Sequence, residues 1–319
     1  MRILIFGGTG FCGSHLAQLC AEQGNQVFVT GRKDRLRLLD SISFLKVDVN
    51  DPKTIEEALI KARPDHVYHL AGFASVGKSF QNQEEVYRTN VLGTFHVLSG
   101  IKKYSPKARV LVVGSAEEYG PVPSDDLPIK ESTLLRPLSP YGVSRVASTL
   151  MSLRESNCHH ADGLQLVATR TFNLTGPGQS DSYVCSDFAK QMAGASLEGK
   201  RELVLRVGNV SVKRDFSSVI DGMRAYQSLI EKGQSGCVYN VCSGESVAIS
   251  EIIQMLADIS GLKVHIEIDN KRFRNLEVKE VRGDPTALLK VCSQKTGSLK
   301  SSLTKLFQSW RDLFGQNKC

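Results

Sequence analysis

Gly7-Gly8-Thr9-Gly10-Phe11-Cys12-Gly13 follows the apolar run Arg2–Phe6 and opens an amphipathic stretch, Phe11–Gln23. Glycines at this spacing permit a tight turn and let a phosphate group approach the backbone closely. A helix that begins in such a turn directs its N-terminal N–H groups at that phosphate. The stretch therefore predicts a dinucleotide-binding site immediately after the first strand. The residues expected to line it are Gly7, Thr9, Gly10, Phe11, Cys12 and Gly13.

Apolar runs of strand length alternate with segments of helix length through the first half of the chain. The runs after the glycine turn are Gln26–Thr30, Phe44–Val47, His66–Leu70, Arg109–Val113 and Leu164–Thr169. The helical segments between them are Asp51–Ala62, Glu84–Tyr104 and Pro140–Glu155. This alternation predicts an α/β fold with a doubly wound parallel sheet of the Rossmann type, covered by helices on both faces.

The pattern loosens after about residue 173, where shorter strands and Pro-Gly turns follow. We therefore expect a dinucleotide-binding domain over residues 1–172 that also takes in about residues 210–240. A smaller mixed α/β domain over residues 173–319 is expected to bind the substrate and to be interleaved with the first.

Composition restricts the classes of partner. The chain has 319 residues, 41% of them hydrophobic, and a formal net charge of +7. Its basic residues are scattered, so a phosphate-bearing small molecule fits the charge better than a nucleic acid. The apolar opening ends at Gly7-Gly8 and no run approaches the ~20 residues of a membrane helix, so we expect neither secretion nor a membrane partner.

The eight cysteines include no Cys-x-x-Cys pair, which favours free thiols in a reducing cytoplasm. Cys158-His159-His160 is the one stretch that suggests metal ligands. Adjacent side chains at a helix end diverge, and no second cluster of ligands follows, so no metal site is expected.

The end of the second strand indicates which dinucleotide is favoured. An acidic residue there would accept hydrogen bonds from the ribose of NAD, but this chain has Val29-Thr30-Gly31-Arg32-Lys33. Arg32, with Thr30 and Lys33 nearby, suits the 2′-phosphate of NADP, whereas ordinary solvated cations would leave NAD as the alternative. Asp48, at the end of the third strand, is placed to meet the adenine amino group.

Two further stretches carry acid–base chemistry. In Ser139-Pro140-Tyr141-Gly142-Val143-Ser144-Arg145, Tyr141 and Arg145 are four residues apart and share one helix face. A phenol transfers protons near neutrality only when a neighbouring cation lowers its pKa from about 10. Ser115 follows the strand Arg109–Val113, where the ends of parallel strands gather ligands.

These motifs resemble the extended short-chain dehydrogenases/reductases, a family of sugar-nucleotide epimerases, dehydratases and reductases. The resemblance runs from the glycine turn to Gly283-Asp284-Pro285. The family's Ser or Thr, Tyr and Lys correspond to Ser115, Tyr141 and Arg145, so the arginine departs from the pattern. It supplies charge and hydrogen bonds to the nicotinamide ribose but does not deprotonate. Further cofactor contacts that the resemblance implies are Val49, Leu70, Ala71, Gly72 and Asn90.

The second half is most similar to the GDP-4-dehydro-6-deoxy-D-mannose reductases and to GDP-mannose 4,6-dehydratase. The similar segments are Arg170–Gln179, Ser186–Gln191, Val207–Asn209, Lys213–Phe216 and Arg274–Val278, with Thr171 and Asn275 standing where proline is usual. The similarity implies that Asn173, Lys190 and Arg214 hold the diphosphate and sugar. It further implies that Arg274 and Glu277 hold the nucleotide ribose, and that Ser75, Ser115 and Glu117 contact the sugar.

The resemblance implies NADPH-dependent reduction of the C4 keto group of a GDP-linked 4-keto-6-deoxy sugar, giving GDP-D-rhamnose or its C4 epimer. Tyr141 would protonate the alkoxide, Ser115 would hydrogen-bond it, and Arg145 would orient the ribose. A dehydratase stays an alternative because Glu117 is retained, although Ala116 has no polar atom. A 4-epimerase would use the same groups, and a catalytically silent sugar-nucleotide binder would explain Arg145.

The family also implies a homodimer and a place in nucleotide-sugar metabolism, such as deoxysugar and lipopolysaccharide biosynthesis. The dimer would form a four-helix bundle from the segments Glu84–Tyr104 and Pro140–Glu155. Its candidate apolar residues are Val86, Val91, Phe95, Leu98, Val146 and Leu150.

Overall fold

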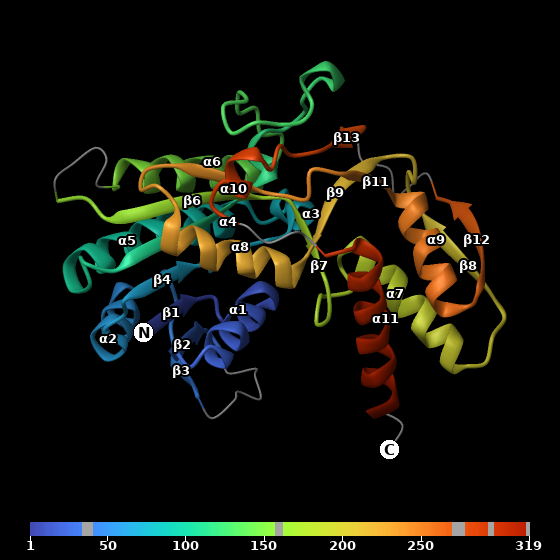
Figure 1. Cartoon of the computed structure of the whole chain (residues 1–319), viewed down its shortest axis with the longest axis horizontal. Helices are drawn as coiled ribbons and strands as arrows, with labels where there is room; N and C mark the ends of the chain where they lie inside the picture. The colour runs from blue at the N-terminus through green and yellow to red at the C-terminus, as the bar shows by residue number, and fades with distance from the viewer. Residues whose placement is uncertain (34–40, 157–161, 270–277, 293–296, 317–319) are drawn as a thin grey trace.

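A computed structural model describes residues 1–33, 41–156, 162–269, 278–292 and 297–316. Within these ranges the chain forms a larger lobe around a seven-stranded sheet and a smaller lobe beside it (Figure 1). No helix in these ranges combines the length and the apolar character that a membrane crossing requires.

The large sheet is parallel throughout, and its strand order is β10-β6-β5-β4-β1-β2-β3. The predicted Rossmann-type fold is therefore confirmed. The strands are β1 (Arg2–Phe6), β2 (Gln26–Gly31), β3 (Ile42–Lys46), β4 (His66–His69), β5 (Arg109–Ser115), β6 (Gln165–Thr171) and β10 (Val238–Val241).

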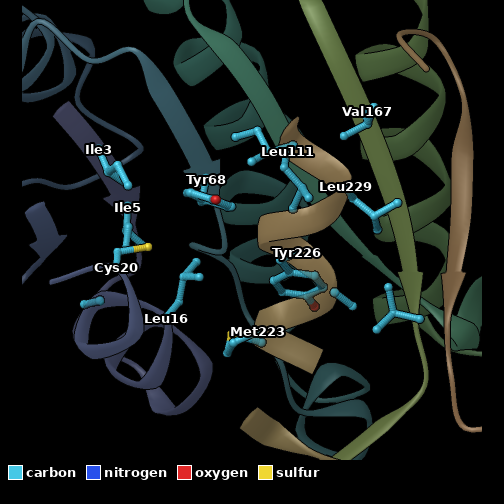
Figure 2. Packing of buried hydrophobic residues seen from close by; sticks show 14 of the residues in the cluster. Ile3, Ile5, Leu16, Cys20, Tyr68, Leu111, Val167, Met223, Tyr226 and Leu229 are labelled. Atoms are coloured by element: carbon cyan, nitrogen blue, oxygen red, sulfur yellow. The ribbon is translucent and has the colours of Figure 1, made fainter. Parts of the chain in front are cut away.

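Helices cover both faces of this sheet. On one face, α1 (Phe11–Glu22) and α8 (Val219–Lys232) pack Leu16, Tyr226 and Leu229 against the strands (Figure 2). On the other, α2 (Pro52–Ala62) and α5 (Gly93–Tyr104) enclose a second apolar cluster. The chain thus returns to the large sheet with α8 and β10 after it has entered the smaller lobe.

Local chemistry sets where the predicted helices begin. Asp51 accepts a hydrogen bond from the Lys53 N–H at 3.0 Å, and Pro52 follows it at the first helical position of α2. Helix α6 (Pro140–Arg154) has the same design, with Ser139 accepting from the Gly142 N–H at 3.0 Å. These caps place Tyr141 in the first turn of α6.

The predicted helical stretch over Glu84–Tyr104 is confirmed, but it is not α-helical throughout. The segment divides into α4 (Gln83–Tyr87), a π-helical turn η1 (Arg88–Leu92) and α5. The side chains of Thr94 and Ser148 both donate to the Asn90 carbonyl at 2.6 Å, so this carbonyl bonds outside the regular helical pattern. Such π turns frequently occur at functional sites.

The smaller lobe contains two short sheets. In the first, β9 (Lys213–Ser218) lies between β11 (Ser246–Ala248) and β13 (Glu280–Val281) and also pairs with β7 (Asn173–Thr175). The second joins β8 (Glu202–Val207) to β12 (Lys263–Ile268). The helices α7 (Val184–Leu197), α9 (Ile249–Ser260) and α11 (Leu299–Gln316) share one apolar cluster.

Candidate functional site

The candidate site lies where β1, β4 and β5 end, at the edge of the sheet where parallel folds bind ligands. Gly7 has a φ of +79°, and a Cβ there would lie 2.7 Å from the Ala71 amide nitrogen. The glycine turn and the loop after β4 are therefore in contact. This contact brings the predicted residues Leu70, Ala71 and Gly72 beside the turn.

The glycine turn forms a cradle for a phosphate. Among the described residues no side chain caps α1 at Gly10, and its first turn holds no acidic residue. A Cβ at Gly13 would collide with the Gly7 carbonyl oxygen, so only glycine lets the helix start this close to the turn. Uncapped N–H groups at a helix N-terminus fit the pyrophosphate of a dinucleotide.

The adenosine side of the turn is built from β2 and β3. Thr30 is buried and its Oγ1 accepts from the Gly7 N–H at 3.3 Å, so it supports the turn. The side chain of Thr9 packs against Gly31, the last residue of β2. Arg32 is exposed and lines an open cavity of about 490 Å³ together with Asn50 and Arg88. Arg88 pairs there with Glu84 at 2.6 Å, so Arg32 is the arginine that a ribose phosphate at this cavity would meet.

Asp48 and Val49 lie just after β3. Asp48 Oδ1 accepts from the Asn50 N–H at 2.9 Å, which fixes the carboxylate at the rim of the adenosine side. His96 Nδ1 lies 3.0 Å from the Val49 carbonyl oxygen, and the Val49 side chain packs against Gly93 at the start of α5. The loop after β3 is therefore tied to the helix that follows η1.

Ser115 and Tyr141 lie on neighbouring elements. Ser115 ends β5, and its Oγ accepts from the Glu117 N–H at 3.2 Å. A Cβ at Gly142 would lie 2.7 Å from the Glu117 carbonyl oxygen, so the turn after Ser115 packs directly on the start of α6. Ser115 and Tyr141 are each 8% exposed. Both hydroxyl-bearing residues thus flank the same end of the sheet.

Arg145 is buried beside Tyr141, with 5% of its surface exposed. Its guanidinium carbon lies 5.3 Å from the centroid of the Tyr141 ring, and Nη1 donates to the Val113 carbonyl at 3.1 Å. A Cβ at Gly72 would lie 2.5 Å from Arg145 Nη2 and 2.9 Å from Asn90 Oδ1. The guanidinium therefore points toward the loop after β4.

The charge of Arg145 has no direct counter-charge. Within the described residues no carboxylate forms an ion pair with it, and its buried Nε has no hydrogen-bond partner. A buried guanidinium in this condition is unfavourable unless a ligand supplies acceptors. Ribose hydroxyls or an anionic oxygen at the loop after β4 would supply them. The nicotinamide half of a dinucleotide bound at the glycine turn fits this requirement.

Asn90 joins the predicted cofactor loop to α6. Its Oδ1 accepts from the Phe73 N–H at 2.7 Å, and its Nδ2 donates to the Ser144 hydroxyl at 2.8 Å. Asn90 was implied by the family resemblance, but the π turn that contains it was not predicted. Asn90 thus fixes the loop after β4 relative to the helix that carries Tyr141 and Arg145.

His69, the last residue of β4, was not among the predicted site residues and is fully buried. Its Nε2 lies 2.9 Å from the Thr94 hydroxyl. Burial, with a smaller contribution from the charge of Arg145, lowers the pKa of His69 to about 3. The histidine is therefore neutral at physiological pH, and it adds no second charge beside Arg145.

The neighbouring glutamates Glu117 and Glu118 divide into an exposed and a buried one. Glu117, the predicted site residue, is exposed, whereas Glu118 is completely buried. Glu118 accepts from the Ser115 N–H at 2.9 Å and pairs with Arg170 at 2.9 Å. Ser115-Ala116-Glu117-Glu118 has the Ser-x-x-Glu pattern of a capping box, and that signal would have revealed Glu118.

The predicted substrate residues fall into separate groups. Asn173 on β7 pairs with Phe216 of β9, so Arg214, two residues earlier on β9, faces the same side of this sheet. Lys190 lies on α7 and forms an ion pair with Asp181 at 2.7 Å. Ser75 caps the short helix α3 (Val76–Ser79). Arg274 and Glu277, like Cys158-His159-His160, lie outside the described residues.

The parallel sheet, the glycine turn and the similarity of the sequence to known enzymes together define a sugar-nucleotide oxidoreductase of the short-chain dehydrogenase/reductase type. The chain belongs to the GDP-mannose 4,6 dehydratase family, whose model matches residues 4–291. It is 33% identical to GDP-6-deoxy-D-mannose reductase of Pseudomonas aeruginosa over 97% of both chains. It is also 30% identical to a UDP-glucose 4-epimerase of Halalkalibacterium halodurans, over 91% of this chain and 86% of the relative.

Solved structures agree with this assignment. RMD from Pseudomonas aeruginosa complexed with NADPH superposes with a TM-score of 0.84 and 30% identity, over 98% of this chain and all of the other. MoeE5 in complex with UDP-glucuronic acid and NAD gives a TM-score of 0.84 at 26% identity, with the same coverage. The similar proteins thus include both NADPH-bound and NAD-bound enzymes.

Proposed function

We propose that this chain uses NADPH to reduce the C4 keto group of GDP-4-dehydro-6-deoxy-D-mannose, giving GDP-D-rhamnose or its C4 epimer. The observation that carries the proposal is the arrangement of Ser115, Tyr141 and Arg145 beside the loop after β4, next to an uncapped glycine turn. The similarity to a GDP-6-deoxy-D-mannose reductase over 97% of the chain supports the choice of substrate.

The reaction needs a hydride at C4 and a proton at the attached oxygen. NADPH, when bound, supplies the hydride. As the electron pair of the C=O bond moves to oxygen, Tyr141 gives that oxygen its phenolic proton and Ser115 donates a hydrogen bond to it. The buried guanidinium of Arg145, 5.3 Å from the Tyr141 ring, stabilises the resulting phenolate until solvent returns a proton. The product is a C4 hydroxyl.

In this proposal each lobe binds one of the two ligands. The larger lobe holds the dinucleotide through the glycine turn, Asp48, Val49 and the loop after β4. The smaller lobe holds the GDP-sugar through Asn173, Arg214 and Lys190. Lys190 already pairs with Asp181, so its binding to a diphosphate requires that it exchange this partner.

NADPH is the proposed cofactor because Arg32 lies at the open cavity beside the end of β2. The NADPH complex of the similar reductase structure supports this choice, whereas the NAD complex of MoeE5 keeps NADH as a weaker alternative. The dehydratase alternative rests on Glu117, but Ala116 offers no acid beside it.

We further propose a homodimer through α5 and α6. Four apolar residues are each more than two-fifths exposed there: Phe95 on α5, Val143 and Leu150 on α6, and Leu92 at the end of the adjoining η1. Val86 and Leu98 were also expected in this interface, but both are buried inside the lobe. A homodimer predicts a mass of twice 35.0 kDa by light scattering, and a mass of 35.0 kDa would refute it.

One assay separates the candidate activities. Purified protein is mixed with NADPH and a 4-keto sugar nucleotide that a separate dehydratase has generated from GDP-mannose. Loss of NADPH absorbance with formation of a GDP-deoxysugar is the expected result. Conversion of GDP-mannose without added reductant would identify a dehydratase. Nucleotide-sugar binding without turnover would identify a silent binder and overturn the proposed function.

A further inference from the structure

Tyr183 belongs to the smaller lobe but reaches the larger one. It directly precedes α7, and its backbone is fixed on both sides. The Tyr183 N–H donates to the Ser180 carbonyl at 3.1 Å, and the Asp187 N–H donates to the Tyr183 carbonyl at 2.8 Å. The position of its side chain therefore follows the position of α7 and of the smaller lobe.

The phenol of Tyr183 contacts the loop after β4 in the larger lobe. Its hydroxyl donates to the Ala74 carbonyl at 3.5 Å, in the loop after β4 and one residue before Ser75. This distance is at the limit for a hydrogen bond, so the bond is weak and easily exchanged. Tyr183 is 41% exposed, so the protein does not enclose it.

Tyr183 also lies close to the catalytic groups. Burial raises the pKa of Tyr183, and Tyr141 and Cys12 add smaller contributions in the same direction. The hydroxyl is thus within electrostatic range of both the proposed proton donor and the glycine turn.

A comparison with the buried Tyr226 shows what distinguishes Tyr183. Tyr226 also lies within electrostatic range of Tyr141, but it is fully buried and its hydroxyl is 2.7 Å from Thr171 Oγ1. Its hydrogen-bonding capacity is used inside the core. Tyr183 combines the same neighbourhood with an exposed side chain and a weak partner.

We propose that Tyr183 is a substrate-positioning residue whose hydroxyl exchanges the Ala74 carbonyl for a hydroxyl of the hexose and thereby holds the sugar ring against Tyr141. This inference rests on the proposed function, since it assumes a GDP-sugar in the site. A phenol both donates and accepts, so the Tyr183 hydroxyl stays paired in the exchange, while the Ala74 carbonyl is released to accept from the ligand or from solvent.

The test is Tyr183→Phe, which removes the hydroxyl and keeps the ring. Calorimetry should show GDP-mannose binding about 3- to 10-fold weaker, the effect of one neutral hydrogen bond, with GDP binding unchanged. In the reductase assay the KM for the keto sugar should rise by the same factor, while kcat and NADPH affinity stay near wild type. Tyr104→Phe, on α5, is the matched control and should change none of these values.

The outcomes distinguish this inference from the proposed function. Equal GDP-mannose binding by wild type and Tyr183→Phe would overturn the role of Tyr183, whatever the turnover. A parallel loss of GDP binding would also overturn it, because the effect would then concern the nucleotide. Absence of turnover in the wild type would overturn the proposed function, while the calorimetric difference between GDP-mannose and GDP would still test Tyr183.

Discussion

The glycine turn and the Tyr141–Arg145 pair lie at the same edge of the sheet, but backbone atoms form the first and side chains form the second. At the turn the backbone forms the site, because Gly7 adopts a φ of +79° and Gly13 leaves room for the turn. At the pair, two buried side chains form the site, and the charge of Arg145 forms no ion pair with any carboxylate that the structure describes. A side-chain atom added at Gly7 or Gly13 would therefore disrupt the turn, whereas replacing a charge or a hydroxyl would disrupt the Tyr141–Arg145 pair.

The difference explains where the chain tolerates departure from its family. The turn has the family's glycines, but the pair has arginine where the family has lysine. The fold accommodates the larger guanidinium because Gly72 leaves space beside Nη2 and the Val113 carbonyl accepts from Nη1. The substitution therefore retains the positive charge but changes the group that carries it.

The largest expected effect comes from removing that charge. Arg145→Ala should lower turnover by about 10²-fold or more, because the phenolate of Tyr141 loses its neighbouring cation. Arg145→Lys should keep or raise turnover, since lysine restores the family's group and transfers a proton. Both are measured as kcat in the NADPH oxidation assay, with circular dichroism as the control for folding.

Two outcomes would contradict this interpretation of Arg145. A wild type that is nearly inactive and is restored by Arg145→Lys would show that the arginine is a lesion. An Arg145→Ala enzyme as fast as wild type would show that Tyr141 does not depend on this cation as the proton donor.

A smaller effect is expected on the cofactor side, at Arg32. If Arg32 binds the 2′-phosphate, Arg32→Ala should weaken NADPH affinity by roughly 1.5–3 kcal/mol, or about 10- to 100-fold, and leave NADH affinity unchanged. Fluorescence titration of both cofactors measures this. Arg154→Ala, an exposed arginine paired with Glu155, is the control. Equal losses for NADPH and NADH would defeat the assignment.

Much of the larger lobe could be predicted from sequence because local signals and the fold agree there. The glycine turn, Asp51 before Pro52, and Ser139 before Pro140 each mark a boundary that the structure confirms. The smaller lobe gave weaker signals, since its strands are short. Even so, Leu303, Leu306 and Phe307 have the helical spacing that would have revealed α11.

The missed site residues depend on contacts between distant segments. His69 reads as part of a buried strand, and its low pKa follows mainly from its complete burial and to a smaller extent from the charge of Arg145. The π turn at Asn90 arises from hydrogen bonds with Thr94 and with Ser148, 58 residues away. Tyr183 contacts the loop after β4 only because the fold brings Ala74, 109 residues away in the sequence, next to it. No periodicity in the sequence encodes these pairings.

The smallest expected effect is a pH dependence of the free energy of unfolding that arises from His69, beside the Tyr141–Arg145 pair. His69 has a pKa of about 3 in the folded protein, against an ordinary value of 6.5. The unfolded chain therefore binds a proton at this residue that the folded chain excludes, so stability falls as pH drops below about 6.5 and continues to fall toward pH 3. The slope for one such group is about 1.4 kcal/mol per pH unit.

Urea unfolding at two pH values measures this contribution. Between pH ~7 and ~5 the wild type should lose about 2 kcal/mol through His69, and His69→Gln should remove that part of the loss. His265→Gln, on the exposed strand β12, is the control and should leave the loss unchanged. Because the charge of Arg145 contributes to the low pKa of His69, Arg145→Ala should reduce the acid loss in the same direction. A His69→Gln protein with the full wild-type loss would show that the acid sensitivity arises elsewhere.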